Sequence, residues 1–520
     1  MKYDYLIVGG GSAGAVLASR LSADGSTSVA LIEAGPNYRS AQTPAAMRGP
    51  NPHRAVTEAT YAPYRWDALQ ARRTKAQQPH RYWRGRGVGG SSAINGQIAI
   101  RGVPEDFNDW SAAGCRGWSF SDVLPAFRSI ETDLKFGGMN YHGDAGPIPI
   151  YRTPMSQWGA VDCAFAQGAL DEGYAWASDH NAPGASGVSP YAINNRDGIR
   201  VSTNDAYLEG ARGRENLAFF CDAHVDKIIF EGDRAVGVRV QIDQSWREIR
   251  AEVVILSAGA VHSPAILLRS GVGPSAELRG LGIELRAELP VGASLQDHPV
   301  MFMPIILNEL SESPDGARHT NVCVRYSSEL AGAGPNDMMM VSLNGFGDSL
   351  GIQAKPDAGA TQLGQIGVWV NQCFSRGTLR LASANPFDEP IIDLNMLNHP
   401  SDIERMRDGV RRLQALGRGS SVRDIGVVAP EFLENRSDDE IDAFAMSQAG
   451  DTQHTTSTCR MGDPDDPDAV VGYDCRVRGI ENLLVVDAST MPSVVRANTH
   501  LTTVMIAERL ANKLLAIGGS

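Results

Sequence analysis

The sequence lacks long apolar runs and an excess of basic residues, and its first predicted strand lies close to Met1. No window approaches the number of apolar residues that a membrane-spanning helix needs. Acidic residues number 60 and basic residues 47, and the net charge of -13 argues against nucleic acid or an anionic membrane as a partner. The first apolar run starts two residues after Met1, which leaves no room for a signal or transit peptide. We therefore expect a cytoplasmic protein with no nucleic-acid and no membrane partner.

The sequence also lacks a paired cysteine motif. Its seven cysteines are scattered, odd in number and never spaced C-x-x-C. They predict ordinary buried thiols and neither a metal site nor a redox motif. With 520 residues, 42% of them hydrophobic, the chain can bury large cores and is expected to form two closely connected domains.

What the sequence does have is a dinucleotide-binding pattern in its first 33 residues. Residues 3–8 predict a buried strand, residues 9–14 (GGGSAG) a tight turn, and residues 13–21 a helix. Gly9 permits the turn, Gly11 lets a pyrophosphate approach the backbone, and Gly14 lets helix and strand pack closely. The N-terminus of this helix would face the phosphates with free N–H groups.

A second strand, predicted over residues 28–32, ends in Glu33, which lies 19 residues after Gly14. At that distance an acidic residue reaches the hydroxyl groups of an adenosine ribose. A carboxylate at this position disfavours the 2′-phosphate of NADP. NAD and FAD both stay open on this motif alone.

A second glycine-rich stretch covers residues 85–98 (GRGVGGSSAINGQI). So many glycines before a short helical run predict a loop whose N–H groups meet an anion or a flat ring, with Ser91 and Asn95 as further donors. Between the two motifs, residues 35–81 show no sustained period and predict a long loop, either a cofactor cover or a plain surface excursion. Trp66 is the only tryptophan of this loop and a candidate to lie against a cofactor.

Two long stretches carry a resemblance to a known family. Residues 85–108 and residues 259–273 (GAVHSPAILLRSGVG) resemble, in order, the two signatures of the glucose-methanol-choline (GMC) family of flavin oxidoreductases. The resemblance implies an α/β fold with a doubly wound, Rossmann-like FAD-binding domain and a discontinuous substrate-binding domain built on an antiparallel sheet. We expect the FAD-binding domain at residues 1–150, 200–297 and 450–520, and the substrate-binding domain at residues 151–199 and 298–449.

The apolar runs also predict individual elements. Residues 253–257 predict a buried strand that ends at the cofactor crevice, and residues 217–220, 227–230 and 236–240 a small antiparallel excursion. Pieces at 301–306, 322–326, 367–370 and 378–381 predict an antiparallel sheet, with Pro304 confining the first piece to a sheet edge. Residues 403–416 predict an amphipathic helix capped by residues 400–402.

The motifs and the resemblance together assign the cofactor contacts. The expected FAD contacts are Gly9, Gly11, Ser12, Ala13, Gly14, Glu33, Ala34, Trp66, Gly85, Gly90, Ser91, Asn95, Gly96, Gln97, Ile98, Val225, Ala258, Gly259, Asp487, Ala488, His500, Leu501 and Thr502. Some family members attach FAD covalently through a histidine in the first signature loop. Because residues 85–97 contain no histidine, we expect non-covalent FAD. His298 lies in a loop that resembles a family loop and is expected to be structural.

The chemistry is expected near the C-terminus. Residues 496–502 open the last predicted helix, whose N–H groups would stabilise negative charge on a reduced flavin. His454 and His500 match the family's active-site pair, whose second member is histidine or asparagine. Imidazole, with a pKa of ~6.5, can accept the alcohol proton as the hydride leaves. We expect His454 to be the base, His500 to hold the substrate oxygen and flavin N5 to accept the hydride, although reversed or shared histidine roles stay open. Trp369 and Gln453 are candidate substrate contacts.

The expected function is therefore FAD-dependent oxidation of a primary alcohol to an aldehyde. Within the family the chain looks most like bacterial oxidases and dehydrogenases of aryl, furfuryl or small aliphatic alcohols, with O₂ or a quinone as electron acceptor. Choline-type substrates are disfavoured because the sequence shows no convincing cage for a quaternary ammonium. An FAD-containing hydroxynitrile lyase without net redox and a redox-silent flavoprotein are the alternatives, because fold does not fix function.

Overall fold

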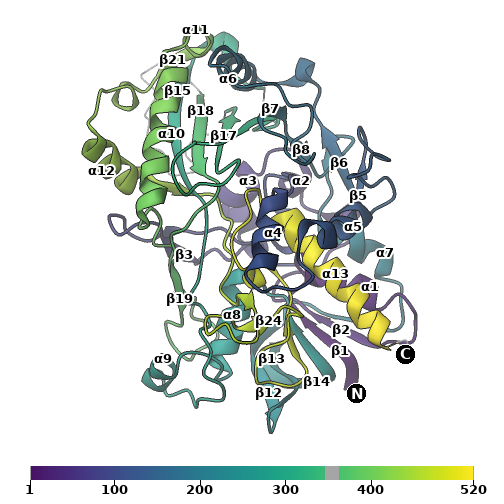
Figure 1. Cartoon of the computed structure of the whole chain (residues 1–520). Coiled ribbons are helices and arrows are strands. Elements are labelled where there is room, and N and C mark those ends of the chain that lie inside the picture. The colour runs from purple at the N-terminus through teal and green to yellow at the C-terminus, as the bar shows by residue number, and fades with distance from the viewer. Residues whose placement is uncertain (1, 315, 346–361, 519–520) are drawn as a thin grey trace.

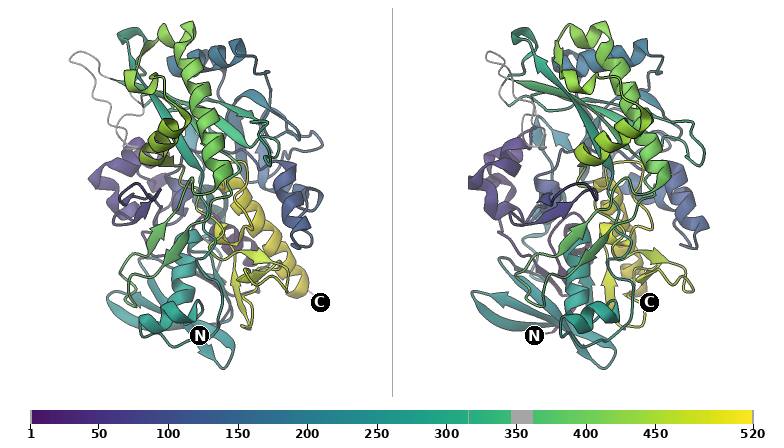
Figure 2. Two further views of the ribbon diagram at one scale, coloured as in Figure 1. Left: turned by 60° about the vertical axis from the view of Figure 1, so that its left-hand side comes forward. Right: turned by 90° about the vertical axis from the view of Figure 1, so that its left-hand side faces the viewer.

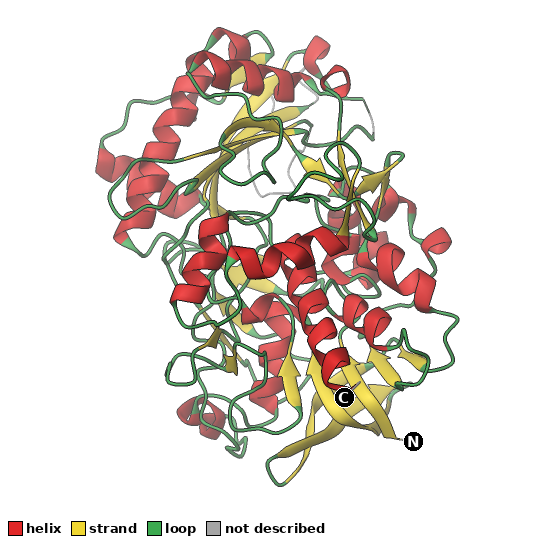
Figure 3. Ribbon diagram, turned by 45° about the vertical axis from the view of Figure 1, so that its right-hand side comes forward, coloured by secondary structure: helices red, strands yellow, loops and turns green. Residues whose placement is uncertain are grey.

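The computed structural model describes residues 2–314, 316–345 and 362–518. Most of its strands belong to two seven-stranded sheets, one in the lower half and one in the upper half of Figure 1. The two views of Figure 2 keep this separation. Figure 3 shows the strands of the two sheets at the bottom and top, with helices and loops between them. The arrangement matches the expected combination of a doubly wound α/β domain with a second domain built on an antiparallel sheet.

The first sheet contains the doubly wound core that the glycine pattern predicts. Its parallel strands are β1 (Lys2–Val8), β2 (Val29–Ile32), β11 (Leu217–Phe220), β14 (Ser245–Leu256) and β25 (Leu483–Val485). The strands β12 (His224–Glu231) and β13 (Arg234–Ile242) extend it as an antiparallel meander from β14. Helix α1 (Gly14–Leu21) follows the glycine turn, and helix α13 (His500–Gly518) packs against it. The carboxyl ends of β1, β2, β14 and β25 therefore share one edge, where a doubly wound sheet binds its ligand.

The predicted antiparallel excursion is confirmed for β12 and β13 and is wrong for β11. Strand β11 pairs with β2 in parallel, Leu217 beside Val29, and extends the parallel sheet. A short apolar run buries the same side chains in either direction, so its sequence does not reveal which neighbour it has.

The second sheet is antiparallel throughout. Its strands are β7 (Gly187–Pro190), β15 (Pro299–Leu307), β16 (Val322–Tyr326), β17 (Met338–Leu343), β18 (Leu363–Val370), β21 (Gly426–Val428) and β22 (Gly450–Asp451). Helix α10 (Pro400–Arg418) covers one face, where Gly409 brings its backbone close to Val368. Because side chains alternate along a strand, Trp369 points to the opposite face. The helix begins at Pro400, within the predicted cap, because proline fits the first helical position.

Two predictions about this sheet are wrong. Strand β15 is not an edge strand: β18 lies on one side and β22 and β21 lie on the other. Pro304 falls between these two short neighbours, where only its carbonyl is used, as acceptor from the Ala429 N–H, so its missing donor costs no hydrogen bond. Strand β19 (Thr378–Arg380) joins a separate small sheet with β20 (Ile391–Asp393), β3 (Gln70–Arg72) and β4 (His80–Arg81).

The remaining elements connect these sheets. They include α2 (Ala45–Arg48), α3 (His53–Thr57), α4 (Pro104–Ala112), α5 (Phe120–Ile130), β5 (Glu131–Asp133), β6 (Ile148–Arg152), α6 (Ala160–Asp171), β8 (Ala192–Ile193), α8 (Gly259–Arg269), α9 (Ser275–Gly280), α11 (Ser420–Arg423) and α12 (Asp438–Gln448). The predicted loop 35–81 thus contains α2, α3, β3 and β4. The exact domain bounds stay a prediction, and residues 1, 315, 346–361 and 519–520 of those ranges lie outside the described residues.

Candidate active site

A cavity of about 810 Å³ is lined by residues of both large sheets. One wall consists of the glycine turn after β1, the end of β2 and the loop 85–98. The wall contributed by the second sheet includes Phe302 on β15, Val341 on β17 and Trp369 on β18. This volume lies within the range of pockets that hold cofactors and small ligands.

The glycine turn brings bare backbone to the cavity. Gly9 has a φ of 102°, and a Cβ there would lie 2.5 Å from the carbonyl oxygen of Ser257. At Gly14 a Cβ would lie 1.8 Å from the Gly9 oxygen, so only glycine lets α1 approach this closely. A Cβ at Gly90 would lie 2.7 Å from the Gly11 Cα. The two glycine-rich loops therefore touch and form one continuous backbone surface.

Glu33 lies in the cavity wall at the end of β2. One carboxylate oxygen accepts the N–H of Gly10 at 2.8 Å, and the other accepts the N–H groups of Gly35 at 2.9 Å and Gly87 at 2.8 Å. Burial raises the pKa of Glu33, and these hydrogen bonds oppose the rise. The carboxylate thus ties both glycine-rich loops to β2 and stands where a ribose hydroxyl can be bound.

A second acidic residue, Asp487, follows β25 at the same sheet edge. Its Oδ2 accepts the Gly259 N–H at 2.9 Å and the Ser263 hydroxyl at 2.6 Å. Asp487 therefore satisfies donors at the N-terminus of α8, as an N-terminal acidic group does.

His454 lies in the cavity wall and is 8% exposed. Its Nε2 lies 3.0 Å from Nδ2 of Asn498. On the other side of the ring, its Nδ1 lies 2.8 Å from the Thr452 hydroxyl and 2.9 Å from Nδ1 of His298. The Trp369 ring stands edge-on at 6.2 Å between centroids.

Burial lowers the pKa of His454 well below its usual value, and the neighbouring His298 and Arg84 lower it further. No carboxylate touches the ring among the contacts of the described residues. The imidazole is therefore neutral at neutral pH and can accept a proton.

His500 has a different position from the one expected. It begins α13, and its Nδ1 lies 3.1 Å from the Ser12 hydroxyl of the glycine turn. Burial lowers the pKa of His500 to about 4, with Arg200 contributing. The side chain against Nε2 of His454 is Asn498, which the sequence analysis did not select. The signal was available, because asparagine is one of the two residues that the family pair admits.

Comparison with known proteins gives the family. Models of the GMC oxidoreductase N- and C-terminal regions match residues 3–300 and 373–507. The chain belongs to the GMC oxidoreductase family. The match confirms the expected family and the expected fold class. Members of this family oxidise alcohols with FAD.

Relatives with assigned names cover the whole length. A 5-(hydroxymethyl)furfural oxidase of Methylovorus sp. (strain MP688) is 35% identical over 99% of this chain and 98% of its own. An alcohol dehydrogenase (acceptor) of Pseudomonas putida is 34% identical, over 98% and 95%. The human mitochondrial choline dehydrogenase is 34% identical, over 98% and 89%. The crystal structure of pyridoxine 4-oxidase from Mesorbium loti superposes with a TM-score of 0.89 and 30% identity, covering 99% of both chains.

The cavity of this GMC protein fits FAD. The glycine turn and Glu33 supply the groups that a diphosphate and a ribose need. Beside the N-terminus of α13, Asn498 Oδ1 lines the cavity and is buried without a partner among the described residues. Buried polar groups are normally satisfied, so this atom and the N–H groups of the first turn of α13 fit the polar edge of a flavin.

Most of the predicted site residues of the GMC chain line the cavity. They are Gly9, Gly11, Ser12, Ala13, Glu33, Ala34, Trp66, Gly85, Gly90, Ser91, Asn95, Gly96, Ile98, Val225, Ala258, Gly259, Trp369, Gln453, His454, Asp487, Ala488 and His500. Gly14, Gln97, Leu501 and Thr502 are not among the lining residues. Gln97 uses its amide elsewhere, on the Gly49 carbonyl and on Asn195. All these roles stay predictions.

Two cavity residues have local partners that the sequence did not indicate. Trp66 stacks on His262 with ring centroids 4.0 Å apart. The amide of Gln453 donates to Asp451 and accepts from Arg84.

In the part of this GMC chain that the structure describes, no helix combines the length and apolarity that crossing a bilayer requires.

Proposed function

We propose that this protein oxidises a primary alcohol to its aldehyde, with non-covalently bound FAD as the hydride acceptor. The proposed substrates are aryl, furfuryl or small aliphatic alcohols, and the proposed final acceptor is O₂ or a quinone. The relatives named for a furfuryl alcohol and for pyridoxine support a ring-bearing alcohol. A cytoplasmic location is part of this proposal.

One observation carries the proposal: a neutral, buried imidazole lies in the same cavity as the glycine turn and Glu33. Hydrogen-bond partners hold the His454 ring on both sides, Thr452 at Nδ1 and Asn498 at Nε2. A base of lowered pKa remains unprotonated at neutral pH, and general bases contribute ~10²- to 10⁴-fold to a rate.

The residues divide the work as follows. Nε2 of His454 accepts the hydroxyl proton of the alcohol. The amide of Asn498 takes the place that the sequence assigned to His500 and hydrogen-bonds the substrate oxygen as it loses its proton. FAD, when bound, supplies the site with an acceptor for the hydride.

His500 has a supporting role in this scheme. Through Ser12 it links the N-terminus of α13 to the glycine turn. The helix N-terminus carries about half a positive charge, which stabilises negative charge in the cavity. Phe302, Val341 and Trp369 supply apolar surface that excludes water and suits a ring.

Anaerobic mixing of the purified flavoprotein with a panel of alcohols tests this function. We expect bleaching of the flavin by benzyl and furfuryl alcohols, formation of the aldehyde, and weaker bleaching by choline. Peroxide in air identifies O₂ as the acceptor, whereas turnover only with an added quinone identifies a dehydrogenase. FAD that remains in the supernatant after acid precipitation supports non-covalent binding.

The same experiment addresses the two alternatives. Release of cyanide from mandelonitrile without bleaching of the flavin would favour a hydroxynitrile lyase. If no alcohol bleaches the flavin and no cyanide is released from the cyanohydrin, the result would favour a redox-silent flavoprotein.

A further inference from the structure

We propose that Thr452, backed by Asp297, is a positioning residue that fixes the tautomer of His454, with the proton on Nδ1 and Nε2 free to accept. The inference rests on the proposed function of His454 as the base. Neither Thr452 nor Asp297 was expected to act in the site.

The pairing of two strands brings these residues together. In β15 and β22, Pro299 lies opposite Asp451 and Val300 opposite Gly450, and a further bridge joins Gln296 and Thr456. The segments just beyond these pairs, 297–298 and 452–454, therefore lie side by side although they are separated by about 150 positions in the chain.

Asp297 anchors this junction. Its Oδ1 accepts the backbone N–H groups of His298 at 2.7 Å and His454 at 2.9 Å, and lies 3.0 Å from the Thr452 hydroxyl. Its Oδ2 accepts the Tyr82 hydroxyl at 2.5 Å. Burial and the neighbouring Asp451 raise the pKa of Asp297 to about 6, and the hydrogen bonds from Tyr82 and His454 oppose the rise. With two N–H groups and one hydroxyl already donating to its oxygens, the carboxylate acts as an acceptor. An ionised carboxylate only accepts hydrogen bonds.

The Thr452 hydroxyl has one proton, and the Asp297 carboxylate takes it. The hydroxyl oxygen also lies 2.8 Å from Nδ1 of His454. Because its proton is used on Asp297, this oxygen must accept a hydrogen bond from Nδ1–H. The oxygen of Thr452 therefore acts as a fixed acceptor for Nδ1–H.

His298 is compatible with the same tautomer. Two imidazole nitrogens 2.9 Å apart need one proton between them. Burial lowers the pKa of His298 to about 4, and the backbone carbonyls of Asn371 and Val495 act in the opposite direction. Once the Thr452 oxygen places the shared proton on Nδ1 of His454, Nδ1 of the neutral His298 ring is a second acceptor for it.

The cavity side of the ring completes the pattern. An amide nitrogen only donates hydrogen bonds, so Asn498 Nδ2 at 3.0 Å requires a lone pair on Nε2 of His454. The contacts on both sides of the ring thus select the one tautomer that can take a proton from substrate. The second neighbour of an active-site imidazole commonly sets its tautomer in this way.

Thr452→Val removes the hydroxyl acceptor and keeps the shape of the side chain. Thr452→Ser keeps the hydroxyl and removes only the methyl group. We expect the limiting rate of anaerobic flavin reduction by alcohol to fall roughly 10-fold in the valine variant, which is the effect of losing one good hydrogen bond. The serine variant should stay within about twofold of the wild type. The dissociation constant for the alcohol and the FAD content should not change, because Thr452 acts on His454.

Thr458→Val is the matched control. Thr458 is also buried and also uses its hydroxyl in a hydrogen bond, to the Ala260 carbonyl at 2.7 Å, but it touches neither His454 nor His298. Its reduction rate should match the wild type. If the valine variant of Thr452 is poorly folded, Thr452→Ala gives the same comparison.

Three results would overturn the inference. The Thr452→Val and Thr452→Ala variants could retain the wild-type rate, serine could fail to restore it, or Thr458→Val could lose as much. In each case wild-type bleaching would leave the proposed oxidation intact. A wild-type flavin that no alcohol bleaches would refute both.

Discussion

His454 and His142 are both buried imidazoles, yet their surroundings differ in charge. The ring of His142 is fully buried, with Nδ1 2.7 Å from Glu131 and Nε2 2.8 Å from Asp179. Burial acts to lower the pKa of His142, but the hydrogen bonds to Asp179 and Glu131 outweigh it and raise the pKa to about 9. Among the residues that the structure describes, no such carboxylate touches the ring of His454, and the pKa of His454 falls instead.

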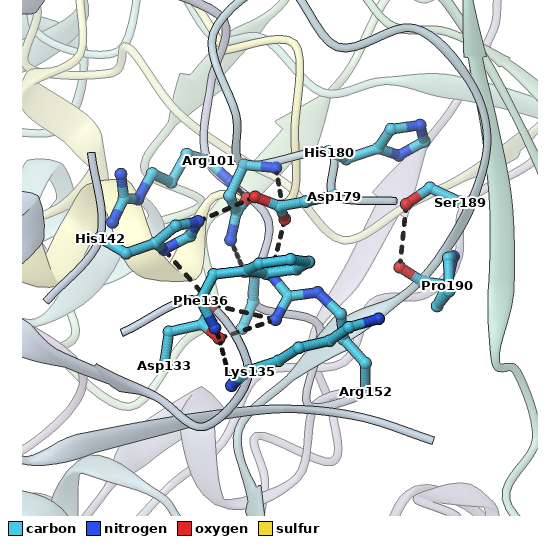
Figure 4. Close-up of polar contacts among 12 residues, drawn as sticks. Arg101, Asp133, Lys135, Phe136, His142, Arg152, Asp179, His180, Ser189 and Pro190 are labelled. Atoms are coloured by element: carbon cyan, nitrogen blue, oxygen red, sulfur yellow. Dashed lines mark hydrogen bonds and ion pairs between the residues drawn. The ribbon is translucent and has the colours of Figure 1, made fainter. Parts of the chain in front are cut away.

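The surroundings of His142 form a charge network, and Figure 4 shows the part of it around Asp133, Arg152 and Asp179. Arg152 contacts both Asp133 and Asp179, and Arg101 pairs with Glu131. Three acidic groups thus face two guanidinium groups and one imidazolium. The network joins β5 and β6 to the segments that carry Arg101, His142 and Asp179. Burial alone therefore does not tell which histidine is a base; the sign of the neighbouring charges does.

The largest expected effect concerns the base. His454→Ala should lower the limiting rate of flavin reduction by alcohol by roughly 10²- to 10⁴-fold, which is the contribution of a general base. Stopped-flow absorbance under anaerobic conditions measures it, and FAD content at equal protein concentration controls for loss of the cofactor. An unchanged rate would show that another group is the base. The contrast between a catalytic His454 and a structural His142 would then no longer hold.

The next effect concerns stability and not catalysis. His142→Ala leaves Glu131 and Asp179 with an uncompensated buried charge, which we expect to cost roughly 3–5 kcal/mol of unfolding free energy. Denaturant titration followed by circular dichroism measures the loss, and the exposed His80 provides the control variant His80→Ala. The rate of flavin reduction per folded molecule should stay at the wild-type value. A large loss of rate without loss of stability would contradict the structural role of His142.

His142 and His500 also predict losses of stability at opposite ends of the pH range. The pKa of His142 is raised in the folded protein, so its stabilisation is complete below about pH 6.5 and is lost as pH rises through about 9. For His500, whose folded pKa is lowered to about 4, stability is lost as pH falls below about 6.5. Melting temperatures from pH 5 to 10 should decline on both sides. The alkaline decline should be smaller in His142→Gln, and an identical decline would show that other groups cause it.

The sequence predicted the parts of the site that are local in the chain. The strand, glycine turn, helix and Glu33 lie within 33 residues, so their spacing alone gives their geometry. His298 contacts His454 across 156 positions, and no periodicity within either segment reports that contact. Asn498 and His500 are two residues apart and the family pair admits either residue type, so the resemblance alone left both possible; the start of α13 decides that Asn498 faces Nε2 of His454. The charge network of His142 was likewise not predicted, because its members lie on five separate segments, around residues 101, 131–133, 142, 152 and 179.

The smallest expected effect concerns an imidazole between the two extremes. His262 is partly exposed, lies 3.3 Å from the single carboxylate of Glu389, and stacks on Trp66 in the cavity. Partly exposed polar contacts of this kind contribute about 0–1 kcal/mol, while ring stacking contributes roughly 0.5–1.5 kcal/mol beyond burial. His262→Phe keeps the stack and loses the hydrogen bond to Glu389, so FAD affinity in a fluorescence titration of the apoprotein should change less than about threefold. His262→Ala should weaken FAD binding more, by roughly 5-fold, because it also loses the stack. If the two variants lose affinity equally, the contact with Glu389 matters more than the stack.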